Sequence, residues 1–473
     1  MNIVEPRANE IVPAAQSPVQ AAGGEVAPMT DGDRLTGTHL NVLGVQYVLS
    51  FVLEAAVSLR GAGAIMQILY RDDADHPAGQ LSHNTVRNLL QRVGLYEISR
   101  ERPLVDDWIW MIDHTIQAGT MKCLVVMGIR QADFLKLERP LEHHDMDMLD
   151  LIPVETSNGE VVHQQLTAVA ARCGVPAAIL SDRGSDLKKG VELLRQDHPQ
   201  VVGVYDIVHK VSGLIGKLLK DDPQWARFRT SCCSCANAVR QSGMAHLKPL
   251  TPKTKARDMN IDGEISWGTS ALALLQKVRA GELTAAQQID LPLPLMEQKF
   301  AWLDEFAGDL ARWHELNGIG RQACSIVRRF GYDRQLPQRL RALPEGASDD
   351  ARSLVKQIRE FGADTTASLG SLTRVPGSSE VIESVIGKGK QLVGGSGSRG
   401  MTSQVLAMAV AVATTTREFV AEALRNTSIK QLGAWSQKFL PISLQSKRQR
   451  DLPSPDTAEQ NLRNLIPRAT PDF

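Results

Sequence analysis

Cysteines are scarce in this sequence, and its acidic and basic residues cancel. Six cysteines in 473 residues are too few for a disulfide framework. Lys and Arg together number 53, as do Asp and Glu, so the net charge is zero and any surface for a polyanion must be local. The longest apolar run, 405–413, is about half of the ~20 residues that a membrane span needs. We therefore expect a soluble protein of a reducing compartment, the cytoplasm, with no membrane partner.

The chain is large enough to contain several domains. At 473 residues, it exceeds the size at which a single hydrophobic core keeps growing, and two to four domains are expected. Hydrophobic residues make up 43%, which excludes a wholly disordered chain. The first 35 residues are rich in Pro, Ala, Gly and Glu without a periodic apolar pattern, which predicts a disordered arm.

The clearest N-terminal helix is expected over 82–94. Ser82 is a suitable N-cap, and Gly94 is a suitable stop. Apolar residues follow helical spacing between them: Val86, Leu89, Leu90 and Val93. The opposite face carries residue types that read base edges and phosphates in a major groove: Asn84, Arg87, Asn88 and Gln91. The pattern fits a helix-turn-helix domain, and it equally fits a helical bundle with a solvated polar face.

A different pattern begins after residue 105. Apolar runs at 108–112 and 124–129 flank a Gly-containing turn and predict an antiparallel hairpin. A third strand, 149–154, contains Pro153, which confines it to a sheet edge. Two short strands, 177–182 and 201–205, alternate with helices. Strands that alternate with helices after a hairpin indicate an α/β fold with a mixed sheet.

Two carboxylates stand at the expected ends of buried strands. Asp113 follows the first apolar strand, and Asp182 ends the fourth. Neighbouring strands would bring the two together, and their like charges would then favour a bound cation. Oxygen ligands favour Mg²⁺ or Mn²⁺, and two such ions about 4 Å apart can drive phosphoryl transfer. A single strand-end Asp is also common in turns and N-caps.

One segment is locally basic in this neutral chain. Between Lys217 and Arg257 there are nine Lys and Arg residues but only two acids. The block ends in four candidate phosphate contacts: Lys248, Lys253, Lys255 and Arg257. The alternative interpretation is an ordinary solvated helix face.

Three short motifs, in order, resemble parts of a DDE-type DNA transposase. They are the hairpin with Asp113, the strand ending in Leu180-Ser181-Asp182-Arg183-Gly184, and the helix Ser378-Ser379-Glu380-Val381-Ile382-Glu383-Ser384. The resemblance assigns Asp113 and Asp182 to the two aspartates of the family's triad and Glu383 to its glutamate. Glu380 lies one helical turn away, on nearly the same face, and is the alternative third ligand.

A fourth motif narrows the type of transposase. Tyr205-Asp206-Ile207-Val208-His209 is similar to the Cys/Asp-x-x-His motif that Mutator-like and hobo/Activator-like members carry after their second aspartate. In the family this histidine lies near the active site, which makes Asp206 and His209 near-site candidates. A histidine at a capped helix start would give the same pattern.

The resemblance implies a complete architecture. After the arm at 1–35, a helix-turn-helix DNA-binding domain would occupy 36–105. An RNase H-like core would be formed by 106–211 and 373–430, split by a helical insertion at 212–372 and followed by a polar tail at 431–473. Trp302 and Trp313, inside the insertion, are expected in its core rather than stacked on bases.

The resemblance also implies an activity and partners. Two Mg²⁺ (or Mn²⁺) ions on Asp113, Asp182 and Glu383 would serve cleavage and strand transfer of double-stranded DNA, at element ends and target. A homodimer is expected, with nucleoid association in a prokaryote. No P-loop is present, so no nucleotide is expected. The alternatives are an RNase H-like nuclease without strand transfer and a transposase-derived DNA-binding protein without catalysis.

Overall fold

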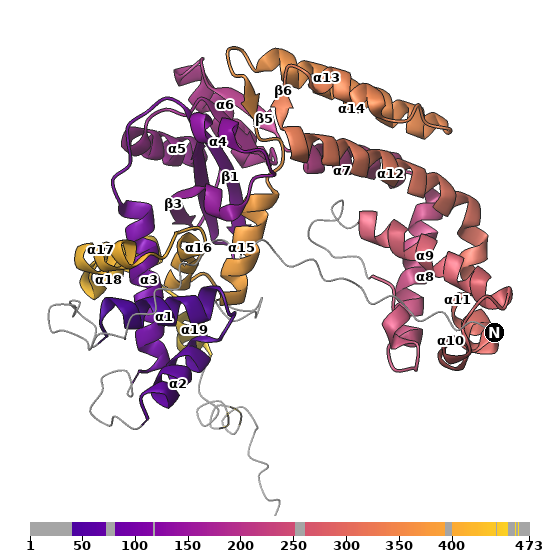
Figure 1. Ribbon diagram of the computed structural model, residues 1–473, viewed down its shortest axis with the longest axis horizontal. Helices are drawn as coiled ribbons and strands as arrows, with labels where there is room; N and C mark the ends of the chain where they lie inside the picture. Colours follow the sequence, from indigo (N-terminus) through magenta and orange to yellow (C-terminus); the bar gives the residue numbers. More distant parts are fainter. Residues whose placement is uncertain are drawn as a thin grey trace, which may run out of the picture.

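The structure is a computed structural model that describes most of the chain. The described residues are 40–71, 81–116, 119–250, 261–392, 400–440 and 442–452, together with Glu459 and Leu462 (Figure 1). The arm expected at 1–35 lies outside these residues. None of the helices within them combines the length and the apolar character that a bilayer crossing requires.

A five-stranded mixed sheet organises the α/β part of the chain. Its strands are β1 (Trp108–Ile116), β2 (Lys122–Arg130), β3 (Asp147–Val154), β4 (Ala178–Ser181) and β5 (Val202–Tyr205). They lie in the order β3-β2-β1-β4-β5. β1 and β3 each pair with β2 in antiparallel fashion, whereas β1–β4 and β4–β5 are parallel. The mixed sheet, the hairpin and the edge strand expected from the sequence are confirmed.

The two faces of the sheet are covered by different helices. Trp110 and Ile112 point to the face covered by α5 (Gly159–Cys173) and α6 (Ser185–Asp197). Met111 points to the other face. That face is covered in part by α7 (Ile207–Lys220) and α15 (Glu380–Leu392). Alternation along β1 therefore decides which side chains meet α7 and α15.

The N-terminal helices share a core with helices from the end of the chain. α1 (Val42–Leu53), α2 (Leu59–Leu69) and α3 (His83–Ser99) pack with α16 (Ala407–Val410) and α17 (Arg417–Asn426). Arg92 on α3 is buried and donates to the backbone oxygens of Leu424 and Thr427, at 2.6 and 2.8 Å. The helices α1–α3 and α16–α17, which the sequence assigns to different domains, thus form one packed unit.

Gly94 does not end its helix, contrary to the sequence-based prediction. α3 continues to Ser99 and begins as expected, with the Ser82 hydroxyl accepting from the Thr85 N–H at 3.2 Å. A Cβ at position 94 would lie 2.1 Å from the backbone oxygen of Leu406. Glycine is therefore needed here for the close approach of a backbone from another part of the chain.

We expect Gly94→Ala to destabilise the fold by about 3 kcal/mol, because a backbone atom, rather than a flexible side chain, blocks the added methyl. Urea denaturation followed by circular dichroism measures the change. Gly318→Ala is the matched control, since Gly318 is an exposed helical glycine and a Cβ there would meet no atom within 4 Å. That substitution should leave stability unchanged or raise it by up to about 1 kcal/mol. Equal effects of the two substitutions would contradict the packing argument.

A long helical region follows the last strand of the sheet. It contains α7, α8 (Pro223–Val239), α9 (Ile261–Arg279), α10 (Ala285–Asp290), α11 (Leu293–Phe300), α12 (Ala307–Phe330), α13 (Leu336–Arg339) and α14 (Asp349–Ser368). Figure 1 shows α7 and α12 running from the sheet toward α8 and α9. Trp313 is fully buried and Trp302 packs against Phe228 and Phe306, so both tryptophans belong to the core of this region. A short antiparallel pair, β6 (Tyr332–Asp333) with β7 (Arg374–Val375), interrupts the helices.

The remaining elements are short. They are α4 (Gln131–Lys136), α18 (Ile429–Phe439), α19 (Leu444–Asp451) and the 3₁₀ turns His143–Asp145, Ala245–Leu247, Ala301–Phe306, Leu340–Ala342 and Ser403–Leu406. The described part of the expected polar tail is largely helical. Leu432 of α18 is buried in the main core, which holds this segment against the rest of the protein.

Candidate active site

Asp113 and Asp182 lie in register on neighbouring strands. The parallel pairing of β1 with β4 ends where Ile112 meets Ser181, so each aspartate follows by one residue. In-register residues of parallel strands point to the same face, here the one covered by α7 and α15. The sequence suggested that Asp113 stands at the end of its strand. The structure differs, because β1 continues to Ile116 opposite β2. What ends beside Asp113 is the contact with β4.

The environment of Asp113 disfavours its charge. Burial raises the pKa of this carboxyl to about 7, and the neighbouring charges of Asp182 and Glu383 add to the effect. The His114 N–H donates to Asp113 Oδ1 at 2.6 Å and opposes it in part. Three carboxylates therefore lie close enough to interact, which is the condition under which a bound cation is favoured.

A tight turn fixes Asp182 after β4. The next residue, Arg183, has φ +57°, a left-handed conformation that is uncommon for residues other than glycine. Asp182 Oδ1 accepts from the Gly184 N–H at 2.8 Å, and the Arg183 guanidinium lies 5.1 Å from the centre of the Tyr205 ring. The turn leads into α6 and leaves the carboxylate partly exposed, facing Asp113.

His209 and Glu383 connect α7 to α15 beside the two aspartates. His209 Nε2 and Glu383 Oε1 are 3.2 Å apart, although 174 positions separate them in sequence. Burial lowers the pKa of His209, but the hydrogen bond with Glu383 and the charges of Asp206 and Asp182 outweigh it, and the pKa is raised overall. The histidine thus favours its cationic form, next to three carboxylates.

Glu380, the alternative third carboxylate, points elsewhere. It forms an ion pair with Arg328 of α12, and its side chain is about half exposed. Glu383 is the glutamate that contacts His209 and raises the pKa of Asp113. The geometry therefore places Glu383, rather than Glu380, beside the aspartates.

Asp206 holds the starts of two helices together. It is completely buried, and its Oδ1 accepts from the His209 N–H at 2.7 Å, which caps α7. Its Oδ2 accepts from both the backbone N–H and the hydroxyl of Ser379, the residue before α15. The Ile207 N–H also donates to the Gly377 oxygen at 2.9 Å. Asp206 thereby sets the position of His209 relative to Glu383.

Sequence reasoning did not single out Ser379 as a partner in this site. The available signal was its place immediately before a helical apolar pattern, where serine often caps a helix. The partner could not be found in the same way, because the acceptor comes from 173 positions earlier in the chain.

The donor chemistry at the site suits Mg²⁺ or Mn²⁺. Asp113, Asp182 and Glu383 offer carboxylate oxygens only, the ligands that these ions prefer. Within the described ranges, no three His, Cys, Asp or Glu side chains already converge closely enough to hold a metal ion. Glu383 is engaged by His209 instead. The carboxylate donors fit two such ions, and the two-ion site itself stays a prediction.

The predicted DNA-reading face of α3 is only partly accessible. Asn84 is exposed, and Arg87 and Asn88 are partly exposed. Gln91 is only 3% exposed, because α3 continues into the core shared with the C-terminal helices. Gln91 therefore cannot read DNA in this conformation, and the helix-turn-helix assignment stays a prediction.

Two of the six described basic residues in the block at 217–257 are paired with acids. Arg227 pairs with Glu305 at 3.0 Å, and Arg229 pairs with the buried Glu264 at 2.9 Å. Lys248 is exposed. The other candidate contacts, Lys253, Lys255 and Arg257, lie outside the described residues.

Comparisons with known proteins include a distant structural similarity. No protein-family model matches the sequence. No curated protein matches it either. Among solved structures, the chain is similar to a Drosophila P element transposase strand transfer complex, at 10% sequence identity and a TM-score of 0.36, over 83% of this chain and 95% of that one.

Proposed function

We propose that this protein is a DNA transposase of the DDE class, with an RNase H-like core formed by 106–211 together with the segment that carries α15. One observation carries the proposal. Asp113 and Asp182 lie in register on one face of a mixed sheet, and the fold brings Glu383 and His209 to them from distant segments. The order of these residues along the chain is the one that the sequence resemblance implies.

Each residue has a role in this proposal. Asp113, Asp182 and Glu383 supply the carboxylates for two divalent ions. When bound, such ions activate an attacking water or DNA 3′-hydroxyl and stabilise the leaving oxygen. His209 holds the Glu383 side chain and contributes positive charge beside it. Asp206 positions both helices from which these two side chains extend.

Double-stranded DNA is the proposed partner, at the element ends and at the target. The helices within 36–105 would bind the ends, through Asn84, Arg87 and Asn88, and Lys248 would contribute from the helical insertion at 212–372 together with Lys253, Lys255 and Arg257. Joining of two ends implies that the enzyme acts as a homodimer.

A cleavage assay tests the function directly. Labelled duplexes carrying the DNA that flanks this gene are incubated with Mg²⁺ or Mn²⁺ and wild-type protein, Asp182→Asn, Glu383→Gln or Glu380→Gln. We expect wild type to nick the element ends and join them to a second duplex. The cleavage rate of Asp182→Asn and of Glu383→Gln should fall by about 10³-fold or more, since metal ligation is worth several kcal/mol.

Glu380→Gln is the matched control for Glu383→Gln. It removes one carboxylate from the same helix but breaks only an exposed pair with Arg328, which costs at most about 1 kcal/mol of stability. Cleavage lost in Glu380→Gln and kept in Glu383→Gln would move the third ligand by one turn. Nicking without joining would identify a nuclease, and binding without any cleavage would identify a DNA-binding protein.

A further inference from the structure

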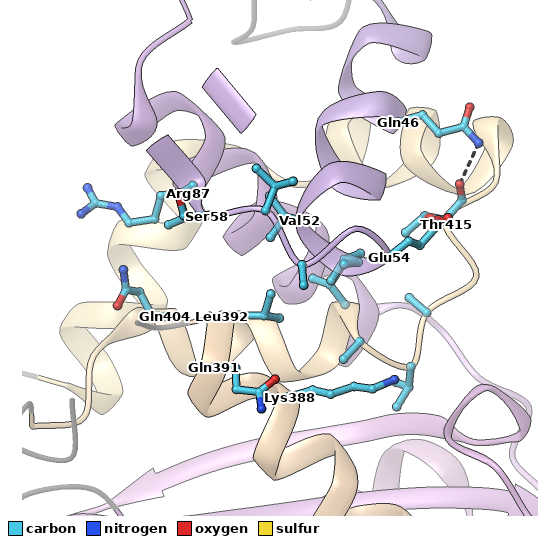
Figure 2. A pocket seen from close by; sticks show the side chains of 18 of the residues that line it. Gln46, Val52, Glu54, Ser58, Arg87, Lys388, Gln391, Leu392, Gln404 and Thr415 are labelled. Carbon is cyan, nitrogen blue, oxygen red and sulfur yellow. Dashed lines mark hydrogen bonds between the residues drawn. The ribbon is translucent and has the colours of Figure 1, made fainter. Parts of the chain in front are cut away.

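A large groove lies between the N-terminal helices and the far end of α15. Its volume is about 1100 Å³. The walls come from the α1–α2 connection, the start of α3, the last residues of α15 and the segment 404–416. We call it the α3–α15 groove, and Figure 2 shows it from close by. Its position connects the helix proposed to bind DNA with the helix that carries Glu383.

Three cations line this groove without an ion-pair partner in the described part of the chain. They are Arg60 of α2, Arg87 of α3 and Lys388 of α15. This contrasts with Arg227 and Arg229 in the sequence-local basic block, which are paired. Glu54 is the one carboxylate among the described lining residues. The described residues that line the groove therefore carry more positive than negative charge.

Lys388 contacts a histidine in the groove, and two side-chain amides lie nearby. Lys388 Nζ lies 2.9 Å from His143 Nε2, and burial together with the charge of Lys388 lowers the pKa of His143. The imidazole therefore accepts from the ammonium instead of competing with it. The side-chain amides of Gln391 and Gln404 make no hydrogen bond within the described ranges, and Figure 2 shows Gln404 near Arg87 and Gln391 near Lys388.

A strained residue shapes one wall. Ala56 lines the groove with φ +52°, in the left-handed region that non-glycine residues rarely occupy. Such outliers cost about 1–3 kcal/mol and persist where the surrounding structure enforces them, often at binding sites. The strain is a second indication, independent of charge, that this wall has a specific shape.

The spacing along α15 suits a DNA backbone. Lys388 follows Glu383 by five residues, a rise of about 7.5 Å along the helix. Successive phosphates of one DNA strand are offset by about 3.4 Å along the duplex axis, so this rise matches about two nucleotides, while the same five residues turn the helix by about 140°. A strand that passes around α15 between the groove and Glu383 would have its backbone neutralised by Lys388 on the way.

We propose that the α3–α15 groove binds the phosphate backbone of the DNA strand that reaches Asp113, Asp182 and Glu383. The inference rests on the proposed function for its substrate class. It adds a site made of Arg60, Arg87 and Lys388, with Gln391 and Gln404 as hydrogen-bond donors to phosphate oxygens. It also explains how a chain with no net charge can hold a polyanion.

Salt-dependent binding tests the groove without requiring catalysis. Fluorescence anisotropy measures the affinity of full-length protein for a labelled duplex from the gene's flank, in EDTA, between about 50 and 200 mM KCl. Arg60→Gln, Arg87→Gln and Lys388→Gln should each weaken binding. The triple variant should reduce the slope of log K against log salt by about 2.7, at about 0.9 per phosphate contact.

A triple control removes the same charge elsewhere. Lys189→Gln, Lys277→Gln and Lys356→Gln change three exposed lysines outside the groove. They should leave the slope within about 0.5 of the wild-type value, which is less than the contribution of one phosphate contact. Lys388→Arg and Arg60→Lys keep the charge and should restore binding, which separates lost phosphate contacts from local misfolding.

The outcomes separate this proposal from the proposed function. If the triple groove variant and the triple control have equal affinity and equal slope, the proposal that the groove binds DNA is overturned, whatever the cleavage assay shows. A reduced slope in the groove triple alone supports it, even if wild type never cuts DNA.

Discussion

Replacing Asp113 with asparagine is expected to reduce metal-dependent DNA cleavage by about 10³-fold or more while leaving DNA binding intact. The substitution keeps the shape of the side chain but removes one of the carboxylates that face one another on the sheet. Metal-assisted stabilisation of the reacting oxygens is worth several kcal/mol, which converts to that loss in rate. Single-turnover cleavage of a labelled duplex measures it.

The same variant should gain stability in the absence of metal. Burial and the neighbouring carboxylates raise the pKa of Asp113 to about 7, so at pH 8 the wild-type protein holds an unfavourable buried charge. Asparagine removes that charge, and the melting temperature in EDTA at pH 8 should rise by a few degrees. An Asp113→Asn protein that melts lower than wild type and cuts normally would contradict the placement of Asp113 in the site.

Replacing Asp206 with alanine should cost both stability and activity. Three donors lose their acceptor, namely the His209 N–H and the backbone N–H and hydroxyl of Ser379. Each unsatisfied buried group costs about 1–3 kcal/mol, so we expect a loss of about 3–5 kcal/mol in urea denaturation. Because α7 and α15 are no longer joined at their starts, cleavage by the remaining folded protein should fall by at least tenfold.

Asp222→Ala is the matched control for Asp206→Ala. Asp222 also caps a helix, α8, with its carboxylate accepting from the Gln224 N–H at 2.9 Å, but its described contacts do not include α15. It should lower stability without lowering cleavage by folded protein. Ser379→Ala should reproduce part of the Asp206→Ala effect on both measurements. An Asp206→Ala protein with full cleavage activity would show that the helix junction does not position the site.

The sheet was predictable because its signals are local. Strands β1, β2 and β4 are short apolar runs between turns, and each can be recognised from a few consecutive residues. Asp113 and Asp182 were found for the same reason, since each follows such a run. Their register could not be predicted, because it depends on where the β1–β4 pairing ends rather than where β1 ends.

The missed features depend on distant partners. Gly94 resembles a helix stop, yet the backbone of Leu406 is what requires it. Gln91 belongs to a polar face by its spacing, but helices from the end of the chain cover it. The prediction of a basic surface from local charge was limited in the same way. Counting along the sequence found a block in which Arg227 and Arg229 are paired with acids from distant segments. The unpaired cations of the α3–α15 groove are gathered only by folding.

The core shared by the N-terminal and C-terminal helices also sets the order of events during synthesis. Arg92 and its acceptor Thr427 are 335 positions apart, and α3 cannot complete its packing until that residue has left the ribosome. At about 5–20 residues per second, the wait is roughly 15–70 s. During this time the apolar surfaces of α1 and α3 that face α16 and α17 remain uncovered. A nascent chain that ends before α17 would therefore expose these apolar surfaces to chaperones.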